Sequence, residues 1–389
     1  MHICPNLEKV STRNCITVAT ILLCVGRRSH MNVLFVSIGD KSYYSAGIKP
    51  FVDLSYGLRK VGVNSENIII TTNPEVREFI TNRFPELPVT YCASVEESLN
   101  FLVRNRPEII VTDDFIEHIK FGLTAKKRYS AKLVVFVQLL HGFNILGRIR
   151  QTTIPASFAS LLPFRAVIAG YSKLLKGADA TIANSGLTHF ILQNIYGIAA
   201  DSIIYPPVGV TLGKIAETKS KDGLLVYLGH GLDYYSRNMA TELQEVKKRL
   251  ELNVSCICSK RENALAKQGF RIFTQLTDQE LSELYGASSA LYSPTIFETF
   301  GYTGPEALLF KTPVLLDTYQ PWLECFPRGT GAIHVLRPRQ RVWQGYLELI
   351  ENQRDMDSAR QTILEQYSVE SASSHFLHLL SELTPCVNK

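Results

Sequence analysis

The chain has 389 residues, enough for two domains of ordinary size, and its 46% hydrophobic and 20% charged residues are typical of a globular protein rather than a disordered one. A net charge of +5, without a cluster of basic and aromatic residues, argues against a nucleic-acid partner. The eight cysteines are scattered and match neither a disulfide scaffold nor a zinc pair, so we expect a reduced, cytoplasmic protein with no metal site.

Residues 1–30 do not resemble the start of a globular domain. The mostly apolar run at residues 15–25 is too short to span a bilayer. Basic residues from Arg27 onward follow this run, where the cleavage site of a signal peptide would need small residues. Because a good strand pattern begins directly after Met31, we expect Met31 to be the natural start and residues 1–30 to be an upstream extension. An N-terminal membrane anchor is the alternative.

Alternating strand and helix patterns predict an α/β domain at residues 31–210. The first strand, at 32–37, is followed by a polar loop with Gly47 and then by a helical pattern. This strand–glycine loop–helix order is found in many nucleotide-binding domains, although an ordinary turn would also explain Gly47. The run at 133–137 is fully apolar, which is typical of a parallel strand buried on both faces.

Polar side chains follow two strands of this domain. Asp113 and Asp114 come at the end of one strand, and an acidic cap before a helix explains them better than a metal site. His141 follows the strand at 133–137, at the carboxyl end, where sheets of this kind bind their ligands. A structural histidine in a turn is the alternative for His141.

The segment 143–176 combines apolar and basic residues and contains no acidic residue. A basic amphipathic surface of this composition can bind anionic lipid. A helix that packs on the core and leaves its cations in solvent explains the pattern equally well. Peripheral contact with the inner face of a membrane is therefore one of two expectations for this segment.

A second α/β domain is expected at residues 223–370. Residues 211–222, rich in Lys and Thr, predict the linker before it. The strand at 224–228 runs into a glycine turn, and further strand patterns lie at 254–258 and 270–273. Thr277 opens a capped helix, and residues 371–389 predict a terminal helix with an apolar face.

The densest pattern of the second domain lies between the strands at 290–292 and 314–316. A loop there leads into a helix near Pro305, and a helix N-terminus presents free N–H groups that favour phosphate. Glu298 and Glu306 flank this loop and can accept hydrogen bonds from sugar hydroxyls. A nucleotide sugar has this layout, with hydroxyls at both ends and phosphates between them. Alternatively, Glu306 only complements the helix dipole and Glu298 is a solvated loop residue.

Two stretches carry a resemblance to a known family. Glu298 and Glu306, with seven residues between them that include Phe300 and Gly301, resemble the E-x7-E signature of glycosyltransferase family 4. The Ala-Asn-Ser at 183–185 and the Tyr-Pro-Pro-Val at 205–208 are most similar to mannosyltransferases that extend lipid-linked oligosaccharides. The resemblance implies an α/β fold of the GT-B type, in which two doubly wound parallel-sheet, Rossmann-like domains face each other across a cleft. The terminal helix would cross back to the first domain.

The resemblance also implies a donor site. Glu306 would hold the ribose hydroxyls and Glu298 the hydroxyls of the donor sugar. Arg237, helped by the backbone N–H groups of Phe300 and Gly301, would stabilise the diphosphate leaving group. The residues implied for catalysis are Glu298, His141 and Arg237, and those implied for substrate binding are Gly47, His230, Lys260, Thr299, Phe300, Gly301 and Glu306. His230 departs from the family, which has an arginine there, and Lys260 is the candidate to compensate.

The implied function is that of a retaining glycosyltransferase. It would move a hexosyl unit, mannosyl or glucosyl, from a nucleoside-diphosphate sugar to a glycan or lipid-linked acceptor, without a metal ion or other cofactor. Two alternatives remain at this point. One is a non-catalytic relative that binds a nucleotide sugar or a partner transferase, and the other is a nucleotide-sugar epimerase of the GT-B fold.

Overall fold

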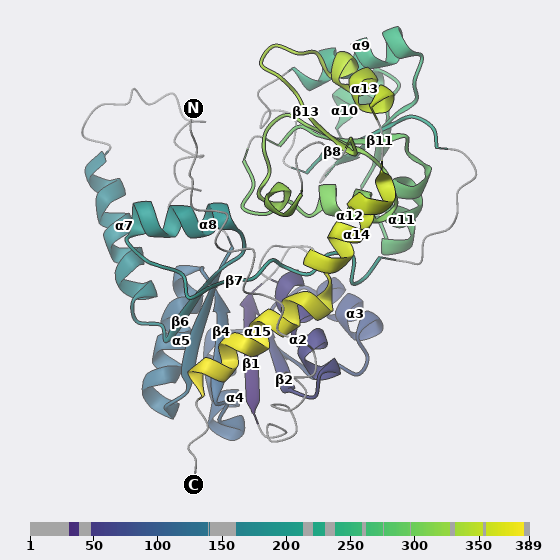
Figure 1. Ribbon diagram of the computed structural model, residues 1–389. Helices are drawn as coiled ribbons and strands as arrows, with labels where there is room; N and C mark the ends of the chain where they lie inside the picture. The colour runs from purple at the N-terminus through teal and green to yellow at the C-terminus, as the bar shows by residue number, and fades with distance from the viewer. Residues whose placement is uncertain are drawn as a thin grey trace.

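The computed structural model describes two α/β domains, each built on one parallel sheet (Figure 1). The described residues are 31–38, 48–138, 140, 161–212, 221–229, 238–258, 262–274, 276–295, 297–326, 331–352 and 355–384, without the side chains of 103–105 and 161–164.

The first sheet has seven strands in the order β3-β2-β1-β4-β5-β6-β7. These strands are β1 (Asn32–Ile38), β2 (Asn64–Ile70), β3 (Val89–Cys92), β4 (Ile109–Asp113), β5 (Lys132–Val137), β6 (Ala180–Ala183) and β7 (Ser202–Ile203). All neighbours pair in parallel. The strand order reverses between β1 and β4, so the crevice at their carboxyl ends is the usual ligand position of such a sheet.

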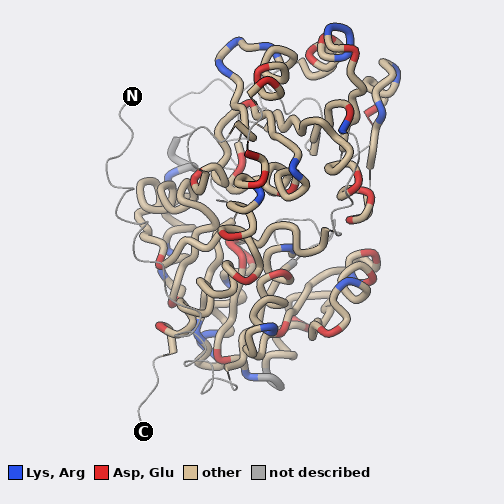
Figure 2. The backbone as a smooth tube through the Cα atoms, turned by 45° about the vertical axis from the view of Figure 1, so that its right-hand side comes forward, with Lys and Arg blue, Asp and Glu red and all other residues tan. Residues whose placement is uncertain are grey.

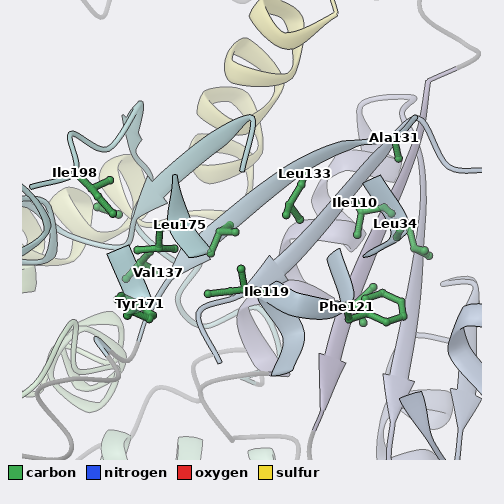
Figure 3. Packing of buried hydrophobic residues seen from close by; sticks show 14 of the residues in the cluster. Leu34, Ile110, Ile119, Phe121, Ala131, Leu133, Val137, Tyr171, Leu175 and Ile198 are labelled. Atoms are coloured by element: carbon green, nitrogen blue, oxygen red, sulfur yellow. The ribbon is translucent and has the colours of Figure 1, made fainter. Parts of the chain in front are cut away.

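Helices cover both faces of the first sheet. They are α2 (Lys49–Lys60), α3 (Pro74–Arg83), α4 (Val95–Asn105), α5 (Ile116–Tyr129), α7 (Leu161–Leu175) and α8 (Gly186–Ile191), which continues into the π-helical turn η3 (Leu192–Tyr196). On one face, Ile119 and Phe121 of α5 and Tyr171 of α7 pack against apolar strand residues such as Leu133 (Figure 3). The apolar runs of the sequence thus form strands buried on both faces.

The second sheet has six parallel strands in the order β10-β9-β8-β11-β12-β13. These strands are β8 (Leu224–Leu228), β9 (Val254–Cys258), β10 (Arg271–Phe273), β11 (Ala290–Ser293), β12 (Val314–Leu316) and β13 (Ile333–Val335). The helices around it are α9 (Met239–Leu250), α10 (Asn263–Lys267), α11 (Asp278–Ala287), α12 (Thr303–Leu309), the 3-10 turn η5 (Pro321–Cys325), α13 (Val342–Glu351) and α14 (Met356–Gln366).

The last helix, α15 (Val369–Leu383), packs against the first domain (Figure 1). The ring centroid of Phe376 lies 5.7 Å from that of Phe35 on β1. Gly57 of α2 allows a close approach, because a Cβ there would lie 2.0 Å from the Ser373 hydroxyl oxygen. The chain therefore ends on the domain in which it began.

The fold class predicted from the sequence is confirmed, and so is the capping box of Thr277 and Glu280. One helix boundary was wrong. The helix α12 begins at Thr303, so Pro305 lies in its first turn as expected, but it ends at Leu309 and not at about Lys311, where the sequence placed its end. Lys311 has a φ of +54°, a left-handed conformation that an α-helix cannot continue through.

Charged residues of both signs are distributed over the molecule. Figure 2 shows acidic and basic residues spread over both domains rather than one surface of a single sign. Within the described ranges, no helix combines the length and the apolar character needed to cross a bilayer.

Candidate functional site

The carboxyl ends of the two sheets meet at the segment 297–302, which we call the signature loop. It follows β11 and leads into α12. Its entry is fixed by the segment after β12, since the Thr318 hydroxyl donates to the carbonyl of Thr295 at 3.0 Å. Gly301 has a φ of +88°, and a Cβ there would lie 2.7 Å from Oε1 of Gln320. A glycine is therefore required at this turn for both conformation and space.

Glu306 is a buried carboxylate. Its residue is 5% exposed, and its Oε2 accepts a hydrogen bond of 3.2 Å from the hydroxyl of Tyr285. Burial raises the pKa of Glu306, whereas the charge of Lys49 and the bond from Tyr285 act to lower it. Burial, and then the charge of Glu306, hold the pKa of Tyr285 well above its usual value, so its hydroxyl stays a donor. Glu306 is thus held in place, unlike a solvated first-turn carboxylate.

Glu298 is partly exposed, and it lies in the same electrostatic environment as Glu306. Both carboxylates act on Tyr227 near the end of β8: burial first, then the charges of Glu298 and Glu306, raise the pKa of Tyr227 to about 12. The two glutamates of the E-x7-E spacing therefore gather at the carboxyl end of the central strand of the second sheet.

The first domain contributes a buried ion pair to this region. Lys49, 3% exposed at the start of α2, lies with its Nζ 3.0 Å from Oδ2 of Asp53. The same Nζ is 5.0 Å from the ring centroid of Tyr302 in the signature loop. A lysine in the first helical turn opposes the helix dipole. This exception to a sequence rule was the signal that could have identified Lys49.

Thr299 and Phe300 connect the signature loop to the junction of the domains. The Thr299 carbonyl accepts a hydrogen bond of 2.8 Å from the Ser185 hydroxyl. The Phe300 ring is buried, and its centroid lies 5.4 Å from that of Tyr367 and 6.4 Å from that of Tyr205. The Phe300 side chain is therefore part of the packing between the domains.

Five predicted site residues, Gly47, His141, His230, Arg237 and Lys260, lie outside the described residues. The strand before each of them is described: β1 precedes Gly47, and β8 precedes Arg237. The strands β8 and β9 come before His230 and Lys260, and β5 comes before His141. The strands β9, β8 and β11 are parallel neighbours, so their carboxyl ends lie at the same edge of the second sheet, from which the signature loop leaves β11.

Asp113 and Asp114 serve as local hydrogen-bond acceptors. Asp114 accepts from the backbone N–H of Gln138 at 2.9 Å and from the hydroxyl of Tyr171 at 3.0 Å. Asp113 accepts from the backbone N–H of Phe115 at 3.0 Å and lies 2.5 Å from Nδ1 of His118. Among the described residues, no group of three or more potential metal ligands is found.

No protein-family model matches the chain. The sequence is 22% identical over 276 residues to the O-antigen chain mannosyltransferase RfbU of Salmonella typhimurium, and the match covers 68% of this chain and 75% of RfbU.

Solved structures match over nearly the whole chain. Anabaena HepE in complex with UDP-glucose has a TM-score of 0.68 at 13% identity, covering 91% of this chain and 100% of HepE. A glycosyltransferase from Rickettsia africae has a TM-score of 0.65 at 15% identity, covering 92% and 99%. The fold is GT-B. In this fold the signature loop belongs to the second domain, and Lys49 and Ser185 approach it from the first.

Proposed function

We propose that the protein is a glycosyltransferase that moves a hexosyl unit from a nucleoside-diphosphate sugar to a glycan or lipid-linked acceptor. The observation that carries the proposal is Glu306, a buried carboxylate that Tyr285 holds beside the signature loop. The similarity to a mannosyltransferase supports transfer rather than epimerisation. A solved structure of the same fold, that of HepE, contains UDP-glucose. The proposed transferred sugar is a mannosyl or a glucosyl unit.

In the proposed mechanism, the second domain holds the donor. Glu306 accepts hydrogen bonds from the ribose hydroxyls, and Glu298 accepts them from the donor sugar. Arg237 and the backbone N–H groups of Phe300 and Gly301 stabilise the charge that develops on the diphosphate. The remaining donor contacts proposed from the sequence are Gly47, His230, Lys260 and Thr299.

The proposed reaction retains the anomeric configuration. His141 approaches the donor sugar from the first domain. We assign no covalent nucleophile: the departing phosphate takes the proton from the acceptor hydroxyl as that oxygen attacks the same face of the sugar. The cationic side chains and the backbone N–H groups stabilise the negative charge of the diphosphate leaving group, so the proposal requires no metal ion. Closure of the domains would exclude water and limit hydrolysis.

The donor site is tested by calorimetric titration with UDP, GDP, ADP and their common sugar conjugates. We expect one nucleotide family to bind the wild type. Glu306→Gln should weaken this binding roughly 10- to 100-fold, because hydrogen bonds to a charged group contribute about 1.5–3 kcal/mol. Glu351→Gln, which changes an exposed glutamate of α13, is the matched control. A folded wild type that binds none of these nucleotides would favour a non-catalytic relative.

The acceptor side of the proposal rests on a groove of the first domain. A hollow of about 900 Å³ lies between α7 and η3 and is lined by the exposed cations Arg165, Lys173 and Lys176 and by apolar residues such as Ile168 and Ile195. Cations beside apolar side chains suit an anionic lipid or a lipid-linked phosphate. We propose that this surface, whose cations belong to the basic segment 143–176, brings the enzyme to its acceptor at a membrane face.

Vesicle cosedimentation tests this surface. The wild type should bind vesicles with anionic phospholipid and not zwitterionic ones, and Arg165, Lys173 and Lys176 changed together to alanine should abolish most of this binding. Each basic residue near the surface contributes about 1 kcal/mol. Changing Lys247, Lys248 and Arg249 of α9 to alanine removes the same charge from the second domain and should have no effect. Equal losses in both triple variants would contradict a dedicated surface.

A further inference from the structure

The two domains are joined by a carboxylate that binds a helix start. Glu324 of η5, in the second domain, accepts a hydrogen bond of 2.7 Å from the backbone N–H of Gly186 on Oε2 and one of 2.8 Å from the N–H of Leu187 on Oε1. The hydroxyl of Tyr205 donates to the same Oε2 at 3.0 Å. Each carboxylate oxygen is therefore used by the first turn of α8, and the bonds span 138 and 137 residues of sequence.

A second contact lies one residue earlier. The hydroxyl of Ser185 caps α8 by accepting from the N–H of Thr188 at 3.1 Å, and it donates to the carbonyl of Thr299 at 2.8 Å. One short segment of the first domain, 185–187, thus binds both the signature loop and the turn η5 of the second domain. Any rotation of one domain against the other must break these bonds or move the loop.

Gly186 fits this contact closely. A Cβ at this position would lie 2.7 Å from Oε2 of Glu324 and 3.0 Å from its Cδ. The backbone of Gly186 is not in the left-handed region, so the conformation itself does not require glycine. A side chain at this position would have to displace the carboxylate of Glu324.

The position of the Glu324 carboxylate depends on its three hydrogen-bond donors. Burial raises the pKa of Glu324, and the bonds from Gly186, Leu187 and Tyr205 act against that shift. By its surface area the Glu324 residue is exposed, so water could solvate its carboxylate in other positions. The hydrogen bonds therefore determine where Glu324 lies, which makes the contact specific for one arrangement of the domains.

We propose that Glu324 and the segment Ser185–Gly186–Leu187 form an interdomain latch that positions the signature loop for the donor, an inference that rests on the proposed function. Glu324 and Ser185 are positioning residues. Glu324 fixes α8 against the second domain. Ser185 holds the carbonyl of Thr299, which lies in the chain directly after Glu298 and directly before Phe300 and Gly301.

Gly186→Ala is the sharpest test. Alanine suits the first turn of a helix better than glycine, so the variant should fold, but its methyl group displaces Glu324. We expect amide hydrogen exchange of residues 186–188 to rise at least tenfold, and the KM for the donor to rise several-fold with a smaller change in kcat. Gly170→Ala in α7 is the matched control, because a Cβ there meets nothing within 4 Å.

Glu324→Gln provides a second, independent disruption, with Glu351→Gln as its control. Because both changes break one contact, the Gly186→Ala/Glu324→Gln double variant should be no worse than the more impaired single variant. Additive effects, or unchanged exchange at 186–188 in either single variant, would overturn the latch. Hydrogen exchange needs no donor, so a wild type that binds no nucleotide would remove the proposed function and the donor role while the exchange result still decides the contact.

Discussion

Around Glu306 the molecule gathers residues from two other elements, α11 of the second domain and α2 of the first. Tyr285 of α11 donates to its carboxylate, Lys49 of the first domain lowers its pKa, and Asp278 lies within its electrostatic reach. Each of these groups affects the ionisation of Glu306, and with it the role toward ribose hydroxyls that we propose for this carboxylate. The chemistry of the site is thus set by neighbours that the E-x7-E spacing does not contain.

Asp278 makes the stability of the folded protein depend on pH. Burial, and then the charge of Glu306, raise its pKa to about 7, and its side chain is 9% exposed although Nε of Arg83 lies 3.6 Å away. The folded protein therefore binds this proton more tightly than the unfolded chain, where an aspartate titrates near 4. The stabilisation from the bound proton is complete at low pH and is lost as pH rises from about 4 through 7.

We predict that Asp278→Asn removes this loss. The free energy of unfolding of the variant, relative to the wild type, should increase between pH 5 and pH 8, as measured by urea denaturation at several pH values. Asp357→Asn changes an aspartate that is 81% exposed and should leave the wild-type pH curve unchanged. Parallel curves for Asp278→Asn and the wild type would show that Asp278 ionises at the same pH in the folded and unfolded states.

At the scale of the elements, local patterns were predictable and cross-chain contacts were not. Apolar runs bounded by glycine or proline identified β1, β8 and β11, because a parallel strand buried on both faces carries its signal within a few residues. Pro305 lies in the first turn of α12, as its missing N–H group led us to expect. Contacts such as Glu324 with Gly186 join residues 138 apart, and no local period contains them.

Gly304 shows how a neighbouring element determines one residue of α12. A Cβ at Gly304 would lie 2.4 Å from Cζ2 of Trp322, which is fully buried. The indole cannot easily move, since its N–H donates to Oε1 of Gln320 at 2.7 Å. The glycine therefore lets η5 pack on the start of α12, directly beside the signature loop.

Gly304→Ala should destabilise the second domain. Overpacking costs about 1–3 kcal/mol, and the better helix propensity of alanine returns at most about 1 kcal/mol, so we expect a net loss of about 1–2 kcal/mol. Denaturation followed by tryptophan fluorescence measures it. Gly170→Ala, in open space on α7, should instead be neutral or stabilising. A stabilised Gly304→Ala variant would mean that Trp322 can shift without cost.

For the whole molecule, the domains are connected by the two chain segments that cross between them as well as by the latch. The chain leaves the first domain after β7, builds the second sheet, and returns through α15. Where it returns, the backbone N–H of Val208 donates to the carbonyl of Tyr367 at 2.8 Å. The outward and returning segments are thus bonded side by side, so a change in domain orientation must bend both segments together.

The apolar face of α15 belongs to the core of the first domain rather than the second. Phe376 is fully buried and shares a cluster with Phe35, Phe51 and Phe136. Phe376→Ala should therefore destabilise the first domain by about 3–5 kcal/mol, the range for a buried aromatic truncated to alanine. Urea denaturation followed by hydrogen exchange should show amides of β1 and α2 losing protection while those of β8 and α9 keep theirs. Leu364→Ala, at a 42% exposed position of α14, is the control. Equal losses in both domains would mean instead that α15 couples them into one cooperative unit.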